Sequence, residues 1–269
     1  MTLVRRTVLS AMIGMSLMAC APAIAKDKAL QDAVAGAWRA PENKARDSQR
    51  HPVEALTFWG LKPGMTIIEV NPGARGWWTE ILAPYAKATG GTYAAAMPNT
   101  QDANFWKEVA DKSIFGEVKA YTLKGDDFAS LPASSADMVL VARAFHGWAR
   151  QGDTTDNFMG AFYKALKPGG ILAVEQHRAP EGSDPKAGNG YVPESYVIEA
   201  AKKAGFVLDG KSEINANPKD TRDHPFGVWT LRPIRQSSND TKTLTEAERA
   251  KFDAIGESDR MTLRFKKPN

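Results

Sequence analysis

Residues 66–82 hold the feature that most constrains the fold of this chain: a short apolar run, a turn, and a second apolar pattern with a different period. The run around Ile68 predicts a buried strand of a parallel sheet, and Pro72 and Gly73 predict a tight turn. Apolar side chains then recur at helical spacing, at Trp78, Ile81, Leu82 and Tyr85. Ligands of open α/β sheets bind beyond the carboxyl ends of the strands, so this unit predicts an α/β chain with a ligand site at the turn.

The rest of the chain alternates between strand and helix patterns, as a doubly wound sheet requires. Strands are expected at 92–97, 117–123, 138–142 and 171–175, and helices at 104–111, 156–166 and 191–204. Two last strands, at 206–214 and 227–231, are expected to be antiparallel around a long loop. The predicted fold class is α/β, with a mostly parallel sheet of seven strands, an antiparallel last strand and helices on both faces.

Composition bounds the class of protein. A chain of 269 residues with 43% hydrophobic residues can bury one substantial core, so one principal domain is expected. The net charge of +4 is spread along the sequence, without a long Lys/Arg block or a repeat of basic and aromatic residues. Nucleic acid is therefore not expected as a partner.

Residues 1–25 predict a bacterial signal peptide. Arg5 and Arg6 precede an apolar run at 8–19 that is short for a membrane span and is followed by small residues. The arginine pair also matches a twin-arginine export signal, and an ordinary secretory signal is the equal alternative. Two processing sites compete, a lipobox-like run that would attach a lipid to Cys20 and a small-x-small site before Lys26. We expect a periplasmic protein, either lipid-anchored to the membrane or free.

The remaining chain divides into three expected parts: an N-terminal helical cap at 26–60, a main domain at 61–235 and a C-terminal docking segment at 236–269. In the last part, Thr245 and Glu248 have the spacing of a capping box before a helix. Beyond that helix, apolar residues alternate as in an added strand or a docking arm, at Met261, Leu263 and Phe265.

The turn that contains Pro72 and Gly73 resembles motif I of the class I S-adenosylmethionine-dependent methyltransferases. That motif is an acidic strand end followed by spaced glycines. Here Glu69 begins the run Glu-Val-Asn-Pro-Gly-Ala-Arg-Gly, in which Asn71 and Arg75 stand where the motif has glycine. Residues 162–174 are similar to the segment before and through the fifth strand of these enzymes. The chain further resembles an exported bacterial subfamily known only as predicted methyltransferases, in the segments 189–192, 212–218, 223–225 and 256–261. The resemblance implies a Rossmann-like methyltransferase domain with S-adenosylmethionine as cofactor.

Carried over by position, the resemblance implies a set of cofactor contacts. The carboxylate that usually binds the ribose after the second strand is absent, and Asn99 is the polar side chain that stands there instead. Asp126, after the third strand, resembles the acidic turn beside the adenine, and Arg143, after the fourth, can pair with an anionic group. The expected cofactor-binding residues are Glu69, Asn71, Gly73, Arg75, Gly76, Asn99, Asp126 and Arg143.

Two histidines at neighbouring strand ends are the candidate catalytic residues. His146 follows the fourth strand and can act as a general base on a hydroxyl acceptor, because an unperturbed histidine has a pKa near neutrality. His177 follows the fifth strand and comes from the same edge of the sheet. The candidate substrate contacts are Trp148, Tyr191 and His224.

The expected activity is methyl transfer from S-adenosylmethionine to a small-molecule acceptor. One alternative is a non-catalytic exported ligand-binding protein, which the missing glycines and the missing ribose carboxylate favour. A second, less favoured alternative is a metal-dependent enzyme, in which three histidines with Glu175 or Asp223 bind zinc or iron. No closely spaced histidine pair supports this alternative, and no resident metal is assigned.

Export predicts that the protein loses its first residues. Protein recovered from the bacterial envelope should begin at Lys26, or at a Cys20 that carries lipid. Mass spectrometry of the amino-terminal peptide distinguishes these two forms. A mature protein that still begins at Met1 would contradict the predicted signal peptide.

Overall fold

The computed structural model describes residues 27–73, 76–124, 130–151 and 154–269. The predictions for the signal peptide, Cys20, Arg75 and Asp126 fall outside these ranges. Within them, no helix is both long enough and apolar enough to cross a membrane.

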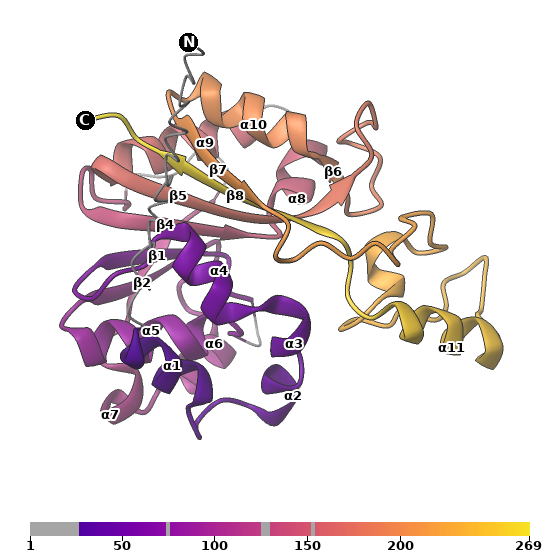
Figure 1. The fold of residues 1–269 in the computed structure, drawn as a ribbon, viewed down its shortest axis with the longest axis horizontal. Helices are drawn as coiled ribbons and strands as arrows, with labels where there is room; N and C mark the ends of the chain where they lie inside the picture. The colour runs from indigo at the N-terminus through magenta and orange to yellow at the C-terminus, as the bar shows by residue number, and fades with distance from the viewer. Residues whose placement is uncertain (1–26, 74–75, 125–129, 152–153) are drawn as a thin grey trace, which may run out of the picture.

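One mixed sheet forms the centre of the molecule (Figure 1). Its strands are β1 (Thr66–Val70), β2 (Thr92–Met97), β3 (Lys119–Thr122), β4 (Ala136–Ala142), β5 (Leu166–Ala179), β6 (Val192–Pro193), β7 (Val207–Ser212) and β8 (Arg260–Lys266). The order is β3-β2-β1-β4-β5-β8-β7, and the short β6 pairs with β5 outside this path. Strands β1 to β5 are parallel, whereas β8 is antiparallel to both of its neighbours. The predicted α/β class, a mostly parallel sheet with an antiparallel last strand, is confirmed.

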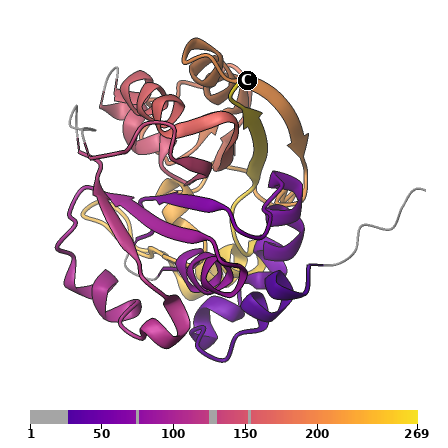
Figure 2. The ribbon, with the colours of Figure 1, turned by 90° about the vertical axis from the view of Figure 1, so that its left-hand side faces the viewer.

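Two apolar layers hold helices on the two faces, because successive side chains of a strand point to opposite sides. Ile68 of β1 contributes to the layer that packs against α8 (Phe145–Arg150), α9 (Thr154–Ala165) and α10 (Glu194–Lys203). Ile67 contributes to the other, with α1 (Lys28–Ala35), α4 (Pro52–Trp59), α5 (Thr79–Thr89), α6 (Ala103–Glu108) and α7 (Lys112–Phe115). Figure 2 shows the two groups of helices on opposite sides of the strands. Burial on both faces explains why the central strands are almost continuously apolar.

Four short helices occupy the range in which a helical cap is expected: α1, α2 (Pro41–Lys44), α3 (Asp47–Arg50) and α4. Proline opens both α2 and α4, at a helical position whose N–H would have no partner within the helix. While α1 and α4 pack in the apolar layer, Arg46 before α3 and Arg50 at its end bond to Glu257 near the C-terminus. Charged contacts thus fix α3 against the distal part of the chain.

The strand predicted at 227–231 is wrong, because Gly227–Thr230 form a 3-10 helix, η1. Gly227 has a φ of 56°, and a Cβ atom there would lie 2.2 Å from the carbonyl oxygen of Asn189. The backbone therefore turns where a strand would have to extend. β8 takes the place next to β7 instead, so the sheet includes residues beyond 235. The added strand that the alternating Met261, Leu263 and Phe265 predict is confirmed.

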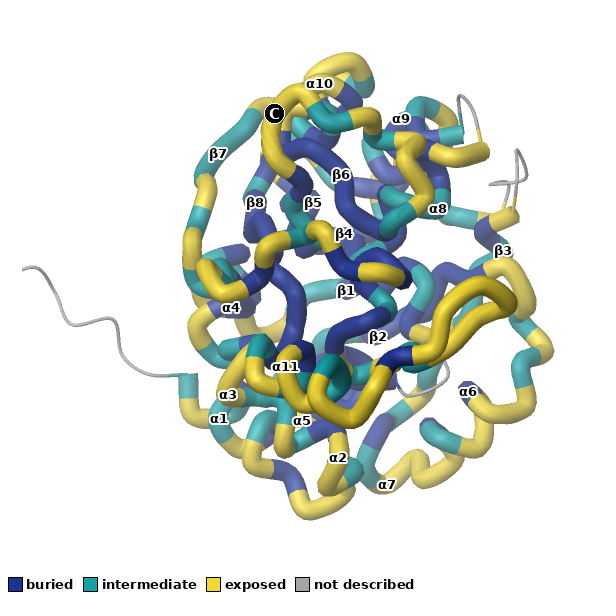
Figure 3. The backbone as a smooth tube through the Cα atoms, turned by 90° about the vertical axis from the view of Figure 1, so that its right-hand side faces the viewer, coloured by how far each residue is buried: buried dark blue, intermediate teal, exposed yellow. Residues whose placement is uncertain are grey.

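The chain between η1 and β8 lies at one side of the molecule, where the parallel strands have their carboxyl ends (Figure 1). It contains α11 (Glu246–Ile255), which begins with the predicted capping box between Thr245 and Glu248. A small apolar cluster, separate from the two layers of the sheet, lies there and consists of Phe226, Leu231, Leu244 and Phe252. Figure 3 shows α11 and exposed chain in front of the buried strands. The last part of the chain thus leaves the sheet, lies over its carboxyl edge and returns as β8.

Leu263 tests how strongly the sheet depends on β8. Leu263→Ala should lower the free energy of unfolding by about 2–5 kcal/mol, because this side chain is fully buried, at 0% exposure. Val207→Ala, on the edge strand and 56% exposed, should change it by less than about 1 kcal/mol. Urea unfolding measures both variants. Equal effects would contradict a central role for β8.

Candidate functional site

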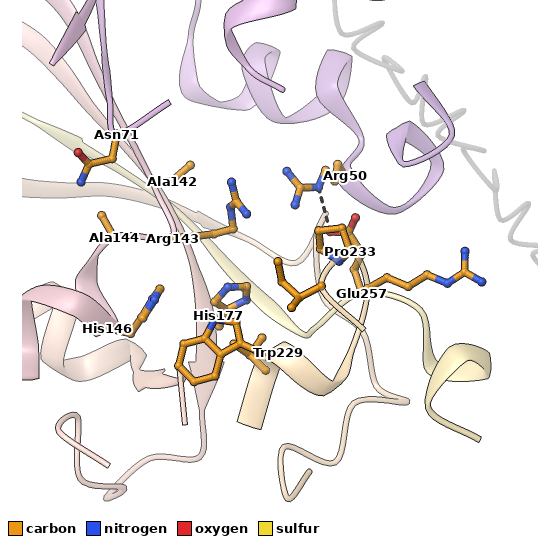
Figure 4. Close-up of a pocket in the computed structure, with 13 residues that line it drawn as sticks. Arg50, Asn71, Ala142, Arg143, Ala144, His146, His177, Trp229, Pro233 and Glu257 are labelled. Carbon is orange, nitrogen blue, oxygen red and sulfur yellow. Dashed lines mark hydrogen bonds and ion pairs between the residues drawn. The ribbon is translucent and has the colours of Figure 1, made fainter. Parts of the chain in front are cut away.

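A cavity of about 250 Å³ opens at the carboxyl ends of β1 and β4 (Figure 4). The chain winds from β1 to β2 in one direction and from β4 to β5 in the other, so the winding reverses between β1 and β4 and a crevice forms there. Four predicted site residues line this cavity: Asn71, Arg143, His146 and His177. Residues from distant segments complete it, among them Arg50, Trp229, Arg232 and Glu257.

The turn after β1 brings Asn71, a residue with an unpaired side-chain acceptor, into the lining of the cavity. Asn71 has a left-handed φ of 50°, and its N–H donates to the carbonyl of Ala96 at 2.8 Å. Its Oδ1 is buried and accepts no hydrogen bond within the described part of the chain. Gly73 and Gly76 follow with φ values of 72° and 46°, which glycine adopts without strain. Asparagine also tolerates this conformation, so Asn71 preserves the turn and adds an acceptor.

Glu69 lies beneath this turn and does not line the cavity. Its side chain is buried, and Oε2 accepts hydrogen bonds from Tyr93 (2.7 Å) and Thr79 (2.9 Å). Burial raises the pKa of this carboxyl to about 7, although the two hydrogen bonds act to lower it. Glu69 therefore joins β1 to β2 and α5, and its predicted contact with a cofactor stays a prediction.

Arg143 is held at the cavity by its backbone. The residue has a φ of 59°, and its N–H donates to the carbonyl of Glu175 at 2.7 Å. Its Nε is buried, and no described residue accepts a hydrogen bond from the guanidinium. Burial lowers the pKa of this guanidinium, because water no longer stabilises the charge.

A buried ion network beside the cavity is not predicted by the sequence. The carboxylate of Glu257 accepts hydrogen bonds from Arg46 (2.6 Å), Arg50 (2.9 Å) and Arg260, and Arg260 also pairs with Glu175. Burial alone would raise the pKa of both carboxyl groups, but the arginines outweigh it and hold both pKa values below the usual value. Both glutamates are therefore ionised at neutral pH. Because Arg50 and Glu257 are 207 residues apart, no local spacing pattern indicates their pairing.

His146 and His177 form one wall of the cavity, with ring centroids 5.9 Å apart. Burial, together with the charges of Arg150 and Arg143, lowers the pKa of His146 to about 4. Burial also lowers the pKa of His177 well below its ordinary value. Both imidazoles are therefore uncharged at neutral pH.

Gln176 determines which nitrogen of His146 carries the proton. The amide nitrogen of Gln176 donates to the carbonyl of Gly190 (3.3 Å) and lies 3.4 Å from Nδ1 of His146. Because that carbonyl requires a donor, we assign Nδ1 as the acceptor and place the proton on Nε2. His146 is then a hydrogen-bond donor, which differs from the expected general base. In His177, Nδ1 lies 2.5 Å from Oγ of Ser258, so Nε2 is its remaining ring nitrogen.

The three predicted substrate contacts do not line the cavity. Trp148 lies in the core, stacked on Phe158 with ring centroids 4.3 Å apart. Tyr191 and His224 are buried, and both bond to the carboxylate of Asp220, at 3.0 and 2.7 Å. These large side chains pack and stabilise the fold, as most large aromatic residues do.

Asn99 does not line the cavity either. It is exposed after β2, and its side-chain oxygen accepts the N–H of Gln101 at 3.0 Å. This side chain therefore closes a local turn, as asparagine often does.

Among the described residues, no group of three or more His, Cys, Asp or Glu side chains is arranged to hold a metal ion. His224, which the metal alternative requires, bonds to Asp220 and is T-shaped against Phe252.

No family model matches the chain, and no curated protein matches it by sequence. Solved structures resemble it in fold. The [4+2]-cyclase SpnF is 17% identical, with a TM-score of 0.52 and coverage of 90% of this chain and 92% of its own. An S-adenosylmethionine-dependent methyltransferase from Methanosarcina mazei is 10% identical, with a TM-score of 0.52 and coverage of 79% and 97%. Phosphoethanolamine N-methyltransferase 2 from Haemonchus contortus, solved with S-adenosyl-L-methionine, is 18% identical, with a TM-score of 0.50 and coverage of 82% and 53%.

These similarities show that the chain has the Rossmann-like fold of the S-adenosylmethionine-dependent methyltransferases. The fold by itself does not fix the reaction, since one of the three proteins is named for a cyclisation. The function has to come from the residues of the site.

The raised pKa of Glu69 predicts a pH-dependent stability. Glu69 binds a proton more tightly in the folded state than in the unfolded state. Its contribution to the free energy of unfolding is therefore complete below about pH 4.5 and is lost as the pH rises through about 7. The loss amounts to roughly 3 kcal/mol. Glu69→Gln keeps an acceptor for Tyr93 and Thr79, and should remove this part of the pH dependence in urea unfolding. Glu199→Gln, on the exposed side of α10, should retain it. A Glu69→Gln protein with the wild-type profile would contradict the shift.

Proposed function

We propose that the protein binds S-adenosylmethionine and transfers its methyl group to a small-molecule acceptor. The observation that carries this proposal is the cavity at the reversal point between β1 and β4, which is lined both by Asn71, with its unpaired Oδ1, and by Arg143. The shared fold supports it, because ligands of such sheets bind at this reversal point.

The residues of the cavity fit the amino-acid end of this cofactor. That end carries an ammonium group, which needs an acceptor, and a carboxylate, which needs cationic donors. Asn71 supplies the acceptor, and Arg50 and Arg143 supply the donors. A volume of about 250 Å³ lies below the range of roughly 300–1,000 Å³ for pockets that hold drug-sized ligands, so it suits this end more than the whole molecule.

The chain contributes alignment and a polar wall. When bound, the cofactor supplies an electrophilic methyl group on a sulfonium centre. His146 donates from Nε2 to an oxygen or nitrogen of the acceptor and orients it, which is the main requirement of a displacement reaction. When Nδ1 of His177 donates its hydrogen bond to Oγ of Ser258, Nε2 carries no proton. Nε2 can then take a proton from the methyl acceptor.

We place this activity in the periplasm, because the first 25 residues resemble an export signal. The protein is either free there or attached to the membrane through a lipid on Cys20. S-adenosylmethionine is a cytoplasmic metabolite, and the twin-arginine route, which exports folded proteins, allows the chain to carry it out of the cytoplasm.

Titration calorimetry with S-adenosylmethionine and S-adenosylhomocysteine tests the proposal. Both ligands should bind, and Asn71→Gly should weaken binding about tenfold, because a hydrogen bond to a charged group is lost. Glycine also adopts the backbone conformation of Asn71. Asn99→Gly is the matched control and should bind as the wild type does, since Asn99 is exposed and outside the cavity.

The absence of heat with either ligand would refute the proposed cofactor. Catalysis is tested separately, by following the formation of S-adenosylhomocysteine with the small-molecule fraction of the periplasm as the source of acceptor. Binding without any turnover would instead support the non-catalytic ligand-binding alternative.

A further inference from the structure

The buried groups around the cavity carry more positive than negative charge. Four arginines lie in this group, Arg46, Arg50, Arg143 and Arg260, and the carboxylates that raise the pKa values of the last three are Glu175 and Glu257. Both carboxylates are ionised, and Glu69, whose pKa of about 7 is lowered by the charge of Arg143, is ionised only in part near neutral pH, so the described part of this group has more than one positive charge in excess. Buried charges without partners are costly, and natural folds rarely keep them without compensation.

The excess belongs to Arg50 and Arg143. Arg260 is paired with both glutamates, and Arg46 bonds to Glu257. Arg50 is 1% exposed and bonds to Glu257 through Nε, but its buried Nη1 has no hydrogen-bond acceptor among the described residues. For Arg143, no hydrogen bond from the guanidinium is found in the described chain.

The two guanidinium groups line the same cavity, and the charge of Arg143 is one of the causes that lower the pKa of Arg50. Figure 4 shows both side chains among the residues that line the cavity, with Arg50 joined to Glu257. Burial lowers the pKa of Arg50 well below its ordinary value, and the charge of Arg143 acts in the same direction. The nearby charge of Glu257 raises this pKa but does not restore the ordinary value. The carbon of the Arg50 guanidinium is 4.9 Å from the ring of Trp77, which is a weaker partner than an anion. An anion between Arg50 and Arg143 would neutralise charge that the chain leaves unpaired.

We propose that Arg50 and Arg143 form a binding site for an anionic oxygen group, a carboxylate or a phosphate, on a ligand that enters this cavity. The guanidinium group presents its donors in a planar fork that matches both groups. A neutral ligand of the same shape is rejected, because it leaves the buried donors unpaired. The site rests on the proposed function only for the source of the anion, which is either the amino-acid end of S-adenosylmethionine or the acceptor.

Binding of inorganic phosphate and of acetate, followed by calorimetry and thermal unfolding, tests the site without any cofactor. Arg143→Gln should weaken binding of these anions about tenfold to a hundredfold, the range for charge-assisted hydrogen bonds. Its melting temperature without anion should equal or exceed that of the wild type, because the substitution removes an unpaired buried charge. Arg143→Lys keeps the charge and should recover part of the affinity.

Arg235→Gln is the matched control. Arg235 lies three residues beyond the cavity residue Arg232 but outside the lining, and its side chain is 49% exposed and pairs with Asp253 at 2.7 Å, so its loss should leave anion binding unchanged. Equal binding of phosphate to the wild type and to Arg143→Gln would overturn the proposal, as would the absence of binding of both anions to the wild type. Arg50→Gln is a second variant. It should fold, because Glu257 keeps two other arginine partners, and circular dichroism checks this.

Two nucleoside thioethers identify the source of the anion. S-adenosylhomocysteine has the amino-acid carboxylate, and 5′-methylthioadenosine lacks the amino-acid end. If Arg143→Gln weakens binding of S-adenosylhomocysteine alone, and phosphate competes with it, the site holds the cofactor's carboxylate. If both thioethers bind equally to wild type and variant while phosphate binds beside them, the site holds an anionic acceptor. Phosphate binding without either thioether would support the site and contradict the proposed cofactor.

Discussion

The buried carboxylate of Glu257 is the interaction on which the arrangement of the cavity depends. It pairs with Arg46, Arg50 and Arg260, and Arg260 extends the network to Glu175 in β5. The removal of each charge from water costs several kcal/mol, so these groups are stable only while they remain paired. The network therefore fixes α3, the loop before β8 and the centre of the sheet in one geometry. Loss of Glu257 would leave three arginines without their shared partner.

The same network gives the cavity an uneven distribution of charge. Arg50 and Arg143 bring unpaired cationic nitrogens to it, whereas burial and the nearby arginines keep His146 and His177 neutral. Stability alone would favour pairing or replacing such cations, and folds tend to retain unsatisfied groups of this kind at functional sites. A cationic region beside a neutral polar wall can hold an anionic group in one place and orient a neutral reactive group in another.

Much of the fold follows from local patterns. The predicted strand 92–97 has the bounds of β2, because a strand buried on both faces is a continuous apolar run. The capping box at Thr245 and the alternation at 261–265 also predict their elements correctly. The strand expected at 227–231 fails because Gly227 takes a positive φ against the backbone of Asn189, a contact between segments that no local pattern contains.

For the site, the sequence by itself determined the turn at Asn71 and placed His146 and His177 at neighbouring strand ends, since strand order and periodicity are local properties of the chain. Only the tertiary structure decided that Trp148 belongs to the core, that Gln176 places the proton of His146, and that Arg50 joins the cavity. The physical reason is that burial and charge pairing depend on which distant segments meet. Arg50 meets Glu257 across 207 residues, and the excess of positive charge arises only when the fold brings Arg50 and Arg143 into the lining of one cavity.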